Sequence, residues 1–358
     1  MGSMTEEIFY KIKDDIHDIE KITLTPQQAY ILDKFSKDIA KIGGIQVQGA
    51  DIKAGEAALK ISQSFDGIQK NSIHQYVSGM MSALIFEGLI DFDNESPPNI
   101  LPSIENLEKN ISILYAGARN QILLYIVEHR AFAYDIDNHG KLLRLVGNFK
   151  GGGERKIQGE IEKVETSSHS GLALGPHTEA PYHCAVKPTE KHSPSPSALI
   201  LSAIWNPGEE PTSIIPLSNI LDKIGVSNIL CLTTKNFNFT RSDSFNEGQG
   251  EDGIGVSILD FDQNHGFSVR FNSYRFTVNH TAPSVVKKAF DTFMQAIAEA
   301  KPFTYSLSQN SAIIINNARA LHCRDIIKDN RRLLVRIFGY SKFSEAIVLS
   351  ESPLIVRG

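Results

Sequence analysis

The chain changes character near residue 140, and this change is the feature that most constrains its fold. Beyond that point, short runs of β-branched and other apolar residues are separated by Gly, Asn, Asp and Pro. Seven or more short strands with turn residues between them predict a sandwich or barrel rather than a βαβ sheet. One helical stretch, 284–300, interrupts them. The runs that we interpret as strands are 198–204, 213–217, 228–233, 256–261, 267–271, 312–315 and 333–338.

The part of the chain before residue 140 is predicted to be helical and to pack on this core. Thr25 is suited to cap a helix, and Pro26 is suited to its first turn. Apolar residues then recur at helical spacing until Gly43 and Gly44. The first four residues, MGSM, resemble a cloning scar, so we assign the helical region to 5–140 and the core to 141–358, together one integrated domain. The helices expected are 26–42, 73–89 and 104–132.

Two segments of the core have the composition of long loops. Residues 187–197 (KPTEKHSPSPS) contain three prolines and little to bury, and 240–255 (TRSDSFNEGQGEDGIG) are rich in glycine and acidic residues. Loops of this length in a compact protein are either functional lids or disordered segments. We therefore predict lid loops at 187–197 and 240–255.

Composition limits the partners of the chain. A net charge of −5 over 358 residues argues against nucleic acid, which requires a concentrated basic surface. No apolar run approaches the roughly 18 residues of a membrane span, so no membrane partner is expected. Three scattered cysteines are too few for a disulfide framework and favour a reducing, cytoplasmic location. A small-molecule substrate is the expected partner. The oligomeric state is open, although the apolar N-terminal helices could serve a homodimer.

The segment GPHTEAPYHC, residues 175–184, concentrates possible metal ligands. His177 and Glu179 are two apart, so on an extended segment both side chains point to one side. His322 follows an apolar strand and a polar turn far downstream, which suits a third ligand from a distant strand. Two histidines and one carboxylate leave open positions on a metal and suit ferrous iron in oxygenases.

Other residues near these three have simpler interpretations. His183 is separated from His177 by Pro181, which interrupts a strand, so we prefer a structural or supporting role for it. Cys184 and Cys323 are expected to be small core residues. Arg332 and Arg336 are four apart on an expected strand, so both should face one side. A buried guanidinium there would suit a carboxylate co-substrate.

These motifs together resemble a known family. The segment HTEAPYH, then Thr212, NNARALH and RRLLVRIFG resemble the clavaminate synthase-like group of iron(II)- and 2-oxoglutarate-dependent oxygenases, which is related to taurine dioxygenase and includes amino-acid hydroxylases. The resemblance covers about residues 145–340. It implies a mostly β fold with added α: a double-stranded β-helix, or jelly roll, flanked by N-terminal helices and one inserted helix.

The resemblance also implies roles for individual residues. His177, Glu179 and His322 would be the catalytic iron ligands, with Fe(II), 2-oxoglutarate and O2 as cofactor and co-substrates. Arg332 and Thr212 would hold the far carboxylate of 2-oxoglutarate, and Arg336 would lie near the co-substrate or substrate. The acidic loop corresponds to a lid in these hydroxylases. On that basis Asp243 is the best candidate for substrate binding, followed by Glu247.

The expected activity is hydroxylation of an unactivated C–H bond in a small molecule. The leading substrate class is a free or carrier-bound amino acid or a derivative, with a basic side chain as one option. Two alternatives stay open. One is a zinc-dependent hydrolase that uses the same His/Glu/His set with a metal-bound water. The other is a jelly-roll binding protein without turnover.

Overall fold

The computed structural model describes residues 18–91, 96–160, 163–262 and 266–358. The proposed cloning scar, 1–4, lies outside these residues, as does 5–17 of the helical region. The described α-helices are α2 (Pro26–Lys41), α3 (Ala50–Gln63), α4 (Gly67–Val77), α5 (Ile104–Leu107), α6 (Ile111–Ile126), α7 (Leu217–Ile224), α8 (Val226–Leu232) and α9 (Ser284–Ala298), with one 3-10 turn, η1 (Asn138–Gly140).

The described strands gather in one large sheet and one smaller sheet, with two minor ones beside them. They are β1 (Ile19–Thr23), β2 (Ala83–Glu87), β3 (His129–Tyr134), β4 (Leu143–Gly147), β5 (Leu174–His177), β6 (Ala198–Trp205), β7 (Thr212–Pro216), β8 (Phe237–Phe239), β9 (Gly253–Val256), β10 (Leu259–Asp262), β11 (Gly266–Val269), β12 (Phe276–Val278), β13 (Phe303–Tyr305), β14 (Ser311–Asn316), β15 (Ala320–Arg324), β16 (Leu333–Ser341), β17 (Val348–Glu351) and β18 (Leu354–Val356).

The large sheet has the order β1-β2-β14-β6-β16-β3-β18-β17, and β4 pairs with the first half of β16. The smaller sheet has the order β13-β7-β15-β5. Apolar residues of both sheets pack together: Ile214 of β7 and Ala320 of β15 share a buried cluster with Leu199 of β6 and Ile313 of β14. The two sheets therefore face each other across a common core, and the functional residues discussed below lie between them.

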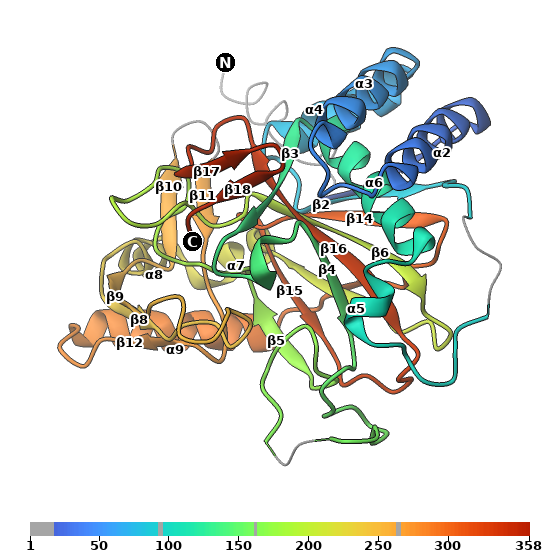
Figure 1. Cartoon of the computed structure of the whole chain (residues 1–358). Coiled ribbons are helices and arrows are strands. Elements are labelled where there is room, and N and C mark those ends of the chain that lie inside the picture. Colours follow the sequence, from blue (N-terminus) through green and yellow to red (C-terminus); the bar gives the residue numbers. More distant parts are fainter. Residues whose placement is uncertain (1–17, 92–95, 161–162, 263–265) are drawn as a thin grey trace, which may run out of the picture.

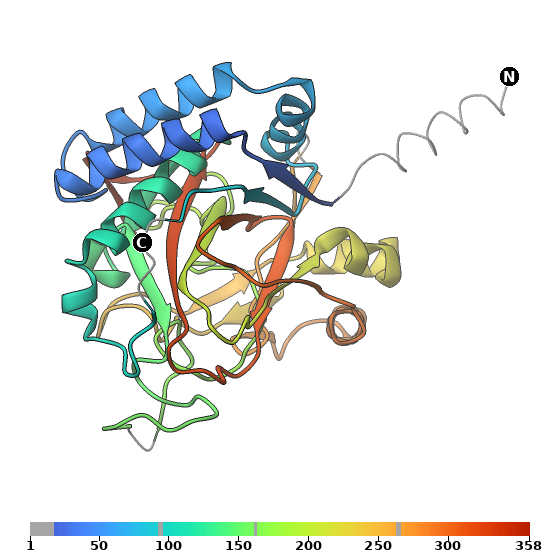
Figure 2. The same ribbon diagram turned by 90° about the vertical axis from the view of Figure 1, so that its right-hand side faces the viewer.

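The N-terminal helices cover the outer face of the large sheet (Figures 1 and 2). Helix α6 lies against β6 and β16, and α2 and α3 pack on α6. Most of α6 is buried, including polar residues such as Asn120, as expected for a helix enclosed on all sides. The expected start of α2 is confirmed, because the Thr25 side chain and Gln28 form a reciprocal capping box and Pro26 begins the helix.

Several predicted elements are wrong in type. The expected helix 73–89 ends at Val77, and β2 follows it as a strand enclosed between β1 and β14. The expected helix 104–132 is divided into α5, α6 and β3, with Glu128 at a φ of 56° where the chain reverses. The expected strand 228–233 is helix α8. Short, continuous apolar runs do not distinguish a buried strand from a helix, and tertiary packing decides between them.

The architecture is accordingly mixed α/β rather than mostly β. Besides α9, which confirms the inserted helix at 284–300, α7 and α8 also lie in the region between β7 and β13. Strands β1, β2 and β3 come from the region expected to be helical, and they join the large sheet. Within the described residues, no helix combines the length and apolarity needed to cross a bilayer.

Candidate metal and co-substrate site

Neighbouring strands of the smaller sheet place two histidines side by side. Strands β5 and β15 are antiparallel, and His177 lies directly opposite His322 in their register. Opposed residues of an antiparallel pair point to the same face. The centres of the two imidazole rings are accordingly 4.2 Å apart.

Glu179 follows on a turn that is held by buried polar groups. The backbone N–H of Glu179 donates to Oδ1 of Asn317 over 2.8 Å, and the N–H of Thr178 donates to the carbonyl of Phe271 over 2.7 Å. Glu179 Oε1 is 3.5 Å from His322 Nε2. One ligand atom from each of His177, Glu179 and His322 lies within 4.8 Å of the others, and in the described residues no other group of histidine, cysteine or acidic residues meets this condition.

The protonation of His177 suits a metal ligand. Its Nδ1 lies 2.7 Å from the carbonyl of Gly175, and because a carbonyl only accepts, Nδ1 carries the proton and Nε2 carries the lone pair. Burial, followed by the nearby His322, lowers the pKa of His177 to about 3, so the ring is neutral at pH 7. Nδ1 of His322 is buried and has no hydrogen-bond partner among the described residues.

The carboxylate of Glu179 is ionised. Burial by itself would raise its pKa, but Arg336, His322 and His177 outweigh burial and hold the pKa well below its usual range. Arg336 Nη1 donates to Glu179 Oε1 over 2.9 Å. The two imidazoles and this carboxylate are a donor set that fits a divalent first-row metal such as ferrous iron.

Arg336 also belongs to a buried ion-pair network with Asp137 and Arg144. Arg336 Nη2 lies 3.3 Å from Asp137 Oδ2, and Arg144 Nη1 lies 2.6 Å from Asp137 Oδ1. Asp137, Arg144 and Arg336 are each less than a tenth exposed. Sequence reasoning missed Asp137 and Arg144, because nothing local distinguishes them from ordinary charged residues.

The three predicted co-substrate residues line one cavity together with the metal-site residues. Thr212, Arg332 and Arg336 belong to its lining, as do His177, Glu179 and His322. Arg332 is 2% exposed, and its Nε and Nη1 have no hydrogen-bond partner among the described residues. Arg324, two residues beyond His322 on β15, also lines the cavity and was not among the residues predicted to bind. The alternation of β15, which puts Arg324 on the face of His322, is the signal that could have identified it.

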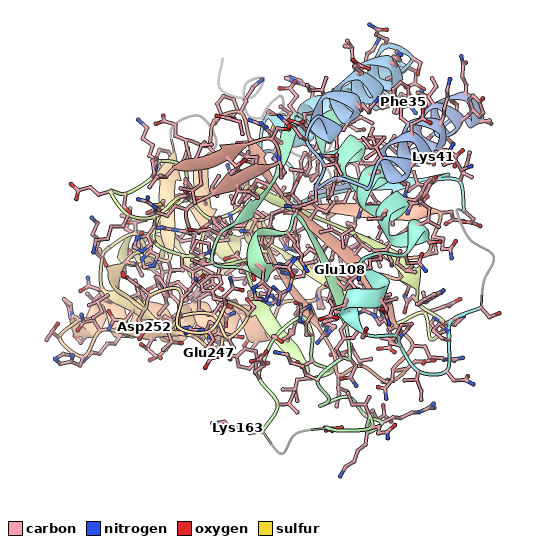
Figure 3. All side chains as sticks on the ribbon, viewed as in Figure 1. Phe35, Lys41, Glu108, Lys163, Glu247 and Asp252 are labelled. Atoms are coloured by element: carbon pink, nitrogen blue, oxygen red, sulfur yellow. The ribbon has the colours of Figure 1, made fainter. Side chains whose placement is uncertain are left out.

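The predicted lid acids lie elsewhere. Asp243 pairs with Arg275 (Asp243 Oδ2 to Arg275 Nη2, 3.1 Å), and Arg275 lines the cavity whereas Asp243 and Glu247 do not. The hydroxyls beside Asp243, those of Ser242 and Ser244, belong to the lining. Glu247 is exposed on the loop after β8, where Figure 3 labels it together with Asp252.

His183 and Cys184, the other candidates in the segment 175–184, both contact His192. The His183 ring stacks on His192, with ring centres 3.8 Å apart and planes inclined by 12°. Cys184 Sγ lies 3.5 Å from the carbonyl of His192, and burial raises its pKa. Burial also raises the pKa of Cys323, which lines the cavity. Among the described residues all three cysteines are free thiols.

Comparisons with known proteins give matches in structure alone. No protein-family model and no curated protein sequence matches the chain. An asparagine oxygenase solved with Fe(II), 2S,3S-3-hydroxyasparagine and succinate superposes with a TM-score of 0.71 at 16% identity, over 94% of this chain and 99% of that one. The non-heme iron oxygenase OrfP, solved with Fe, succinate and (3S)-hydroxy-L-Arg, gives a TM-score of 0.68 at 16% identity, with the same coverage of both chains.

OrfP in complex with Fe and alpha-ketoglutaric acid gives a TM-score of 0.66 at 16% identity, over 90% of this chain and 95% of that one. These superpositions extend over nearly the whole of each chain, although few residues are identical. The chain therefore has the fold of these non-heme iron oxygenases.

Proposed function

We propose that this chain is an iron(II)- and 2-oxoglutarate-dependent dioxygenase that hydroxylates an unactivated C–H bond of an amino acid or amino-acid derivative, free or carrier-bound. The observation that carries the proposal is the meeting of His177, Glu179 and His322 within 4.8 Å, in a cavity that also contains the buried Arg332. The first three residues supply the donor set of ferrous oxygenases. The fourth supplies a cation for an anionic co-substrate, because its Nε and Nη1 have no hydrogen-bond partner among the described residues.

The fold supports the same reading. Counted along the chain, β4, β6, β14 and β16 belong to the large sheet, and β5, β7, β13 and β15 belong to the smaller sheet. The chain thus alternates between the two sheets, as in a double-stranded β-helix, and we infer a jelly-roll core from this order. The structural neighbours were solved with iron, with succinate or alpha-ketoglutaric acid, and with hydroxylated asparagine or arginine.

The residues of this chain have separable tasks in such a reaction. His177, Glu179 and His322 would hold the iron, which when bound supplies activation of oxygen coupled to decarboxylation of 2-oxoglutarate. Arg332 and Thr212 would hold the far carboxylate of 2-oxoglutarate. Arg336, positioned by Asp137 and Glu179, would present a cation to the substrate. The surrounding cavity would exclude water from the reacting atoms.

The residues that line the cavity favour no single class of amino-acid side chain for the substrate. A basic side chain was one option because the 240–255 loop is acidic, but Asp243 is engaged by Arg275 and Glu247 lies outside the cavity. The hydroxyls of Ser242 and Ser244 and the guanidinium of Arg275 line the cavity instead. Neutral polar and acidic amino acids therefore belong in the substrate screen beside basic ones. The cytoplasmic location and the oligomeric state stay predictions.

The test is spectroscopic and chemical. Addition of Fe(II) and then 2-oxoglutarate without oxygen should produce a weak visible charge-transfer band, and admission of air should release succinate, faster with the correct amino acid. His177→Ala should abolish both signals, whereas His280→Ala, an exposed histidine, should leave them unchanged. Arg332→Ala should weaken binding of 2-oxoglutarate much more than binding of iron.

The outcomes separate the alternatives. A zinc hydrolase would show neither the band nor succinate, and would leave the buried Arg332 without a purpose. A binding protein without turnover would bind ligand but release no succinate with any amino acid. Absence of both the band and succinate from the wild-type protein would refute the oxygenase proposal.

A further inference from the structure

A second buried arginine faces the same part of the cavity as Arg332. Arg324 is 9% exposed, and like Arg332 it lines the cavity. Nε and Nη1 of Arg324 are buried without a hydrogen-bond partner among the described residues, as are the corresponding atoms of Arg332. Two adjacent guanidinium groups thus leave four buried N–H-bearing atoms unpaired, although buried polar groups in proteins are almost always paired.

The register of the smaller sheet places Arg324 beside the predicted co-substrate residues. Strand β15 pairs with β7 so that His322 lies opposite Ile214 and Cys323 lies opposite Ser213. Arg324 is the next residue of β15 after Cys323, and Thr212 is the residue of β7 before Ser213. On its other edge Arg324 pairs with Leu174 of β5, after a register shift. Because side chains alternate along a strand, Arg324 shares the inward face of His322 and Thr212. Arg332 reaches the same region from the start of β16.

Within the described part of the chain, one nitrogen of Arg324 holds its guanidinium in place. Nη2 donates to the carbonyl of Ser170 over 2.8 Å and to that of Leu172 over 2.7 Å. These two bonds fix the guanidinium against the segment before β5. They leave Nε and Nη1 available to a ligand. Because the Arg324 side chain is already ordered, binding a ligand would not incur the entropy cost of immobilising it.

The electrostatics of this region favour the binding of an anion. Arg324 is 9% exposed and Arg332 is 2% exposed, and neither donates from Nε or Nη1 to any of the described residues. The carboxylate that acts on both is Glu210, but it accepts from the backbone N–H groups of Lys328 and Asp329. A bound anion would relieve the desolvation of both cations and their mutual repulsion.

We propose that Arg324 and Arg332 bind the distal carboxylate of 2-oxoglutarate together, with Thr212 between them, so that the co-substrate anchor contains two guanidinium groups. This inference rests on the proposed function and adds a binding residue to it. The competing explanation is that Arg324 only ties down the backbone at Ser170 and Leu172. The two explanations differ in whether the effect of removing Arg324 depends on the distal carboxylate of the ligand.

The experiment compares two ligands that differ at that carboxylate alone. The iron(II)-loaded protein is titrated calorimetrically without oxygen, first with 2-oxoglutarate and then with 2-oxopentanoate, which has a methyl group in place of the distal carboxylate. Arg324→Gln should lower the affinity for 2-oxoglutarate by about 10- to 100-fold, the effect of removing one charge-assisted hydrogen bond. Its affinity for 2-oxopentanoate should stay within about threefold of the wild-type value.

A neighbouring arginine supplies the control. Arg331 is more than a third exposed in its side chain and pairs with Asp329 through Nη2 at 2.7 Å, so Arg331→Gln should change neither affinity. If Arg324→Gln weakens both ligands equally, or neither, the two-arginine anchor is wrong. If Arg324→Gln does not fold, Arg324→Lys is used, which keeps the charge but not the planar fork, and the loss must again be confined to 2-oxoglutarate.

Failure of the proposed function gives a different result. In that case the wild-type protein itself binds no 2-oxoglutarate, and the anchor is refuted together with the oxygenase. If wild type binds 2-oxoglutarate and forms the charge-transfer band, but Arg324→Gln is indistinguishable from it, the oxygenase stands and only the role of Arg324 is refuted.

Discussion

The ion-pair network of Asp137, Arg144 and Arg336 permits a quantitative test of how much these buried charges contribute to stability. Asp137 is 5% exposed and bridges two arginines, with Arg144 Nη1 at 2.6 Å and Arg336 Nη2 at 3.3 Å. Asp137→Asn keeps the shape of the side chain but removes its charge. One amide position then presents N–H donors to a guanidinium that can only donate, and two buried cations lose their common counter-ion.

The expected cost follows from the burial of the network. Removing one partner of a buried ion pair costs about 3–5 kcal/mol, because the remaining charge stays out of water. With an unfolding entropy of about 2.1 cal/mol/K per residue, this cost lowers the melting temperature of a chain of this length by about 4–7 °C. Arg336 keeps a second carboxylate partner, Glu179, when Asp137 loses its charge. Most of the destabilisation should therefore come from Arg144, which loses its counter-ion.

Urea unfolding and thermal denaturation followed by circular dichroism measure this cost. Asp222→Asn, an exposed acid on α7, is the matched control and should change stability by less than about 0.5 kcal/mol. In a double-mutant cycle, Asp137→Asn and Arg144→Gln together should cost less than the sum of the single changes, because each alone leaves an unpaired charge. A loss below about 1 kcal/mol for Asp137→Asn would refute the reasoning.

Three further predictions concern the same region and the core. Arg332→Met should leave the ligand-free protein as stable as wild type or more stable, by up to about 4 kcal/mol in urea unfolding, since it removes an unpaired buried cation; a marked loss would mean that Arg332 is already satisfied. Burial lowers the pKa of His129 to about 4, below the value of about 6.5 in an unfolded chain, so the unfolded state binds the extra proton and stability falls as pH drops below about 6.5. His129→Gln should remove about 2 kcal/mol of the difference between urea unfolding at pH 7 and at pH 5, and an unchanged difference would contradict the burial argument. Removal of iron by a chelator should lower the free energy of unfolding by about 2.7 kcal/mol relative to protein in iron at a hundredfold excess over its dissociation constant, and His177→Ala should abolish this difference.

Local patterns predicted that His177 and Glu179 would lie together, and they meet His322 in the candidate metal site, whose role stays a prediction. His177 and Glu179 are two residues apart next to a strand, and alternation of side chains along an extended chain is a local property that needs no knowledge of the fold. The same holds for Thr25 and Pro26 at the start of α2. The arginines of 332–336 were likewise expected on one face, and both line the cavity.

Secondary structure was less predictable where apolar runs are short. Residues 83–86 form a strand because β1 and β14 flank them on both sides, whereas residues 226–232 form a helix that packs on α9. Both are short apolar stretches, and their own propensities differ by less than the free energy that packing contributes. The neighbours that decide between helix and strand come from distant parts of the chain.

The sequence by itself therefore determined the chemistry of the candidate binding groups: two imidazoles, a carboxylate and a guanidinium, each on or next to a strand. Only the tertiary structure decided which charges meet. It joins Asp137 to Arg144 and Arg336, directs Asp243 to Arg275 instead of the cavity, and brings Arg324 and Arg332 to one cavity. The two-residue period of a strand fixes the side on which each residue lies, and this is a local property. The partner of a buried charge depends instead on long-range packing, and on whether the attraction within a pair exceeds the free energy of its desolvation.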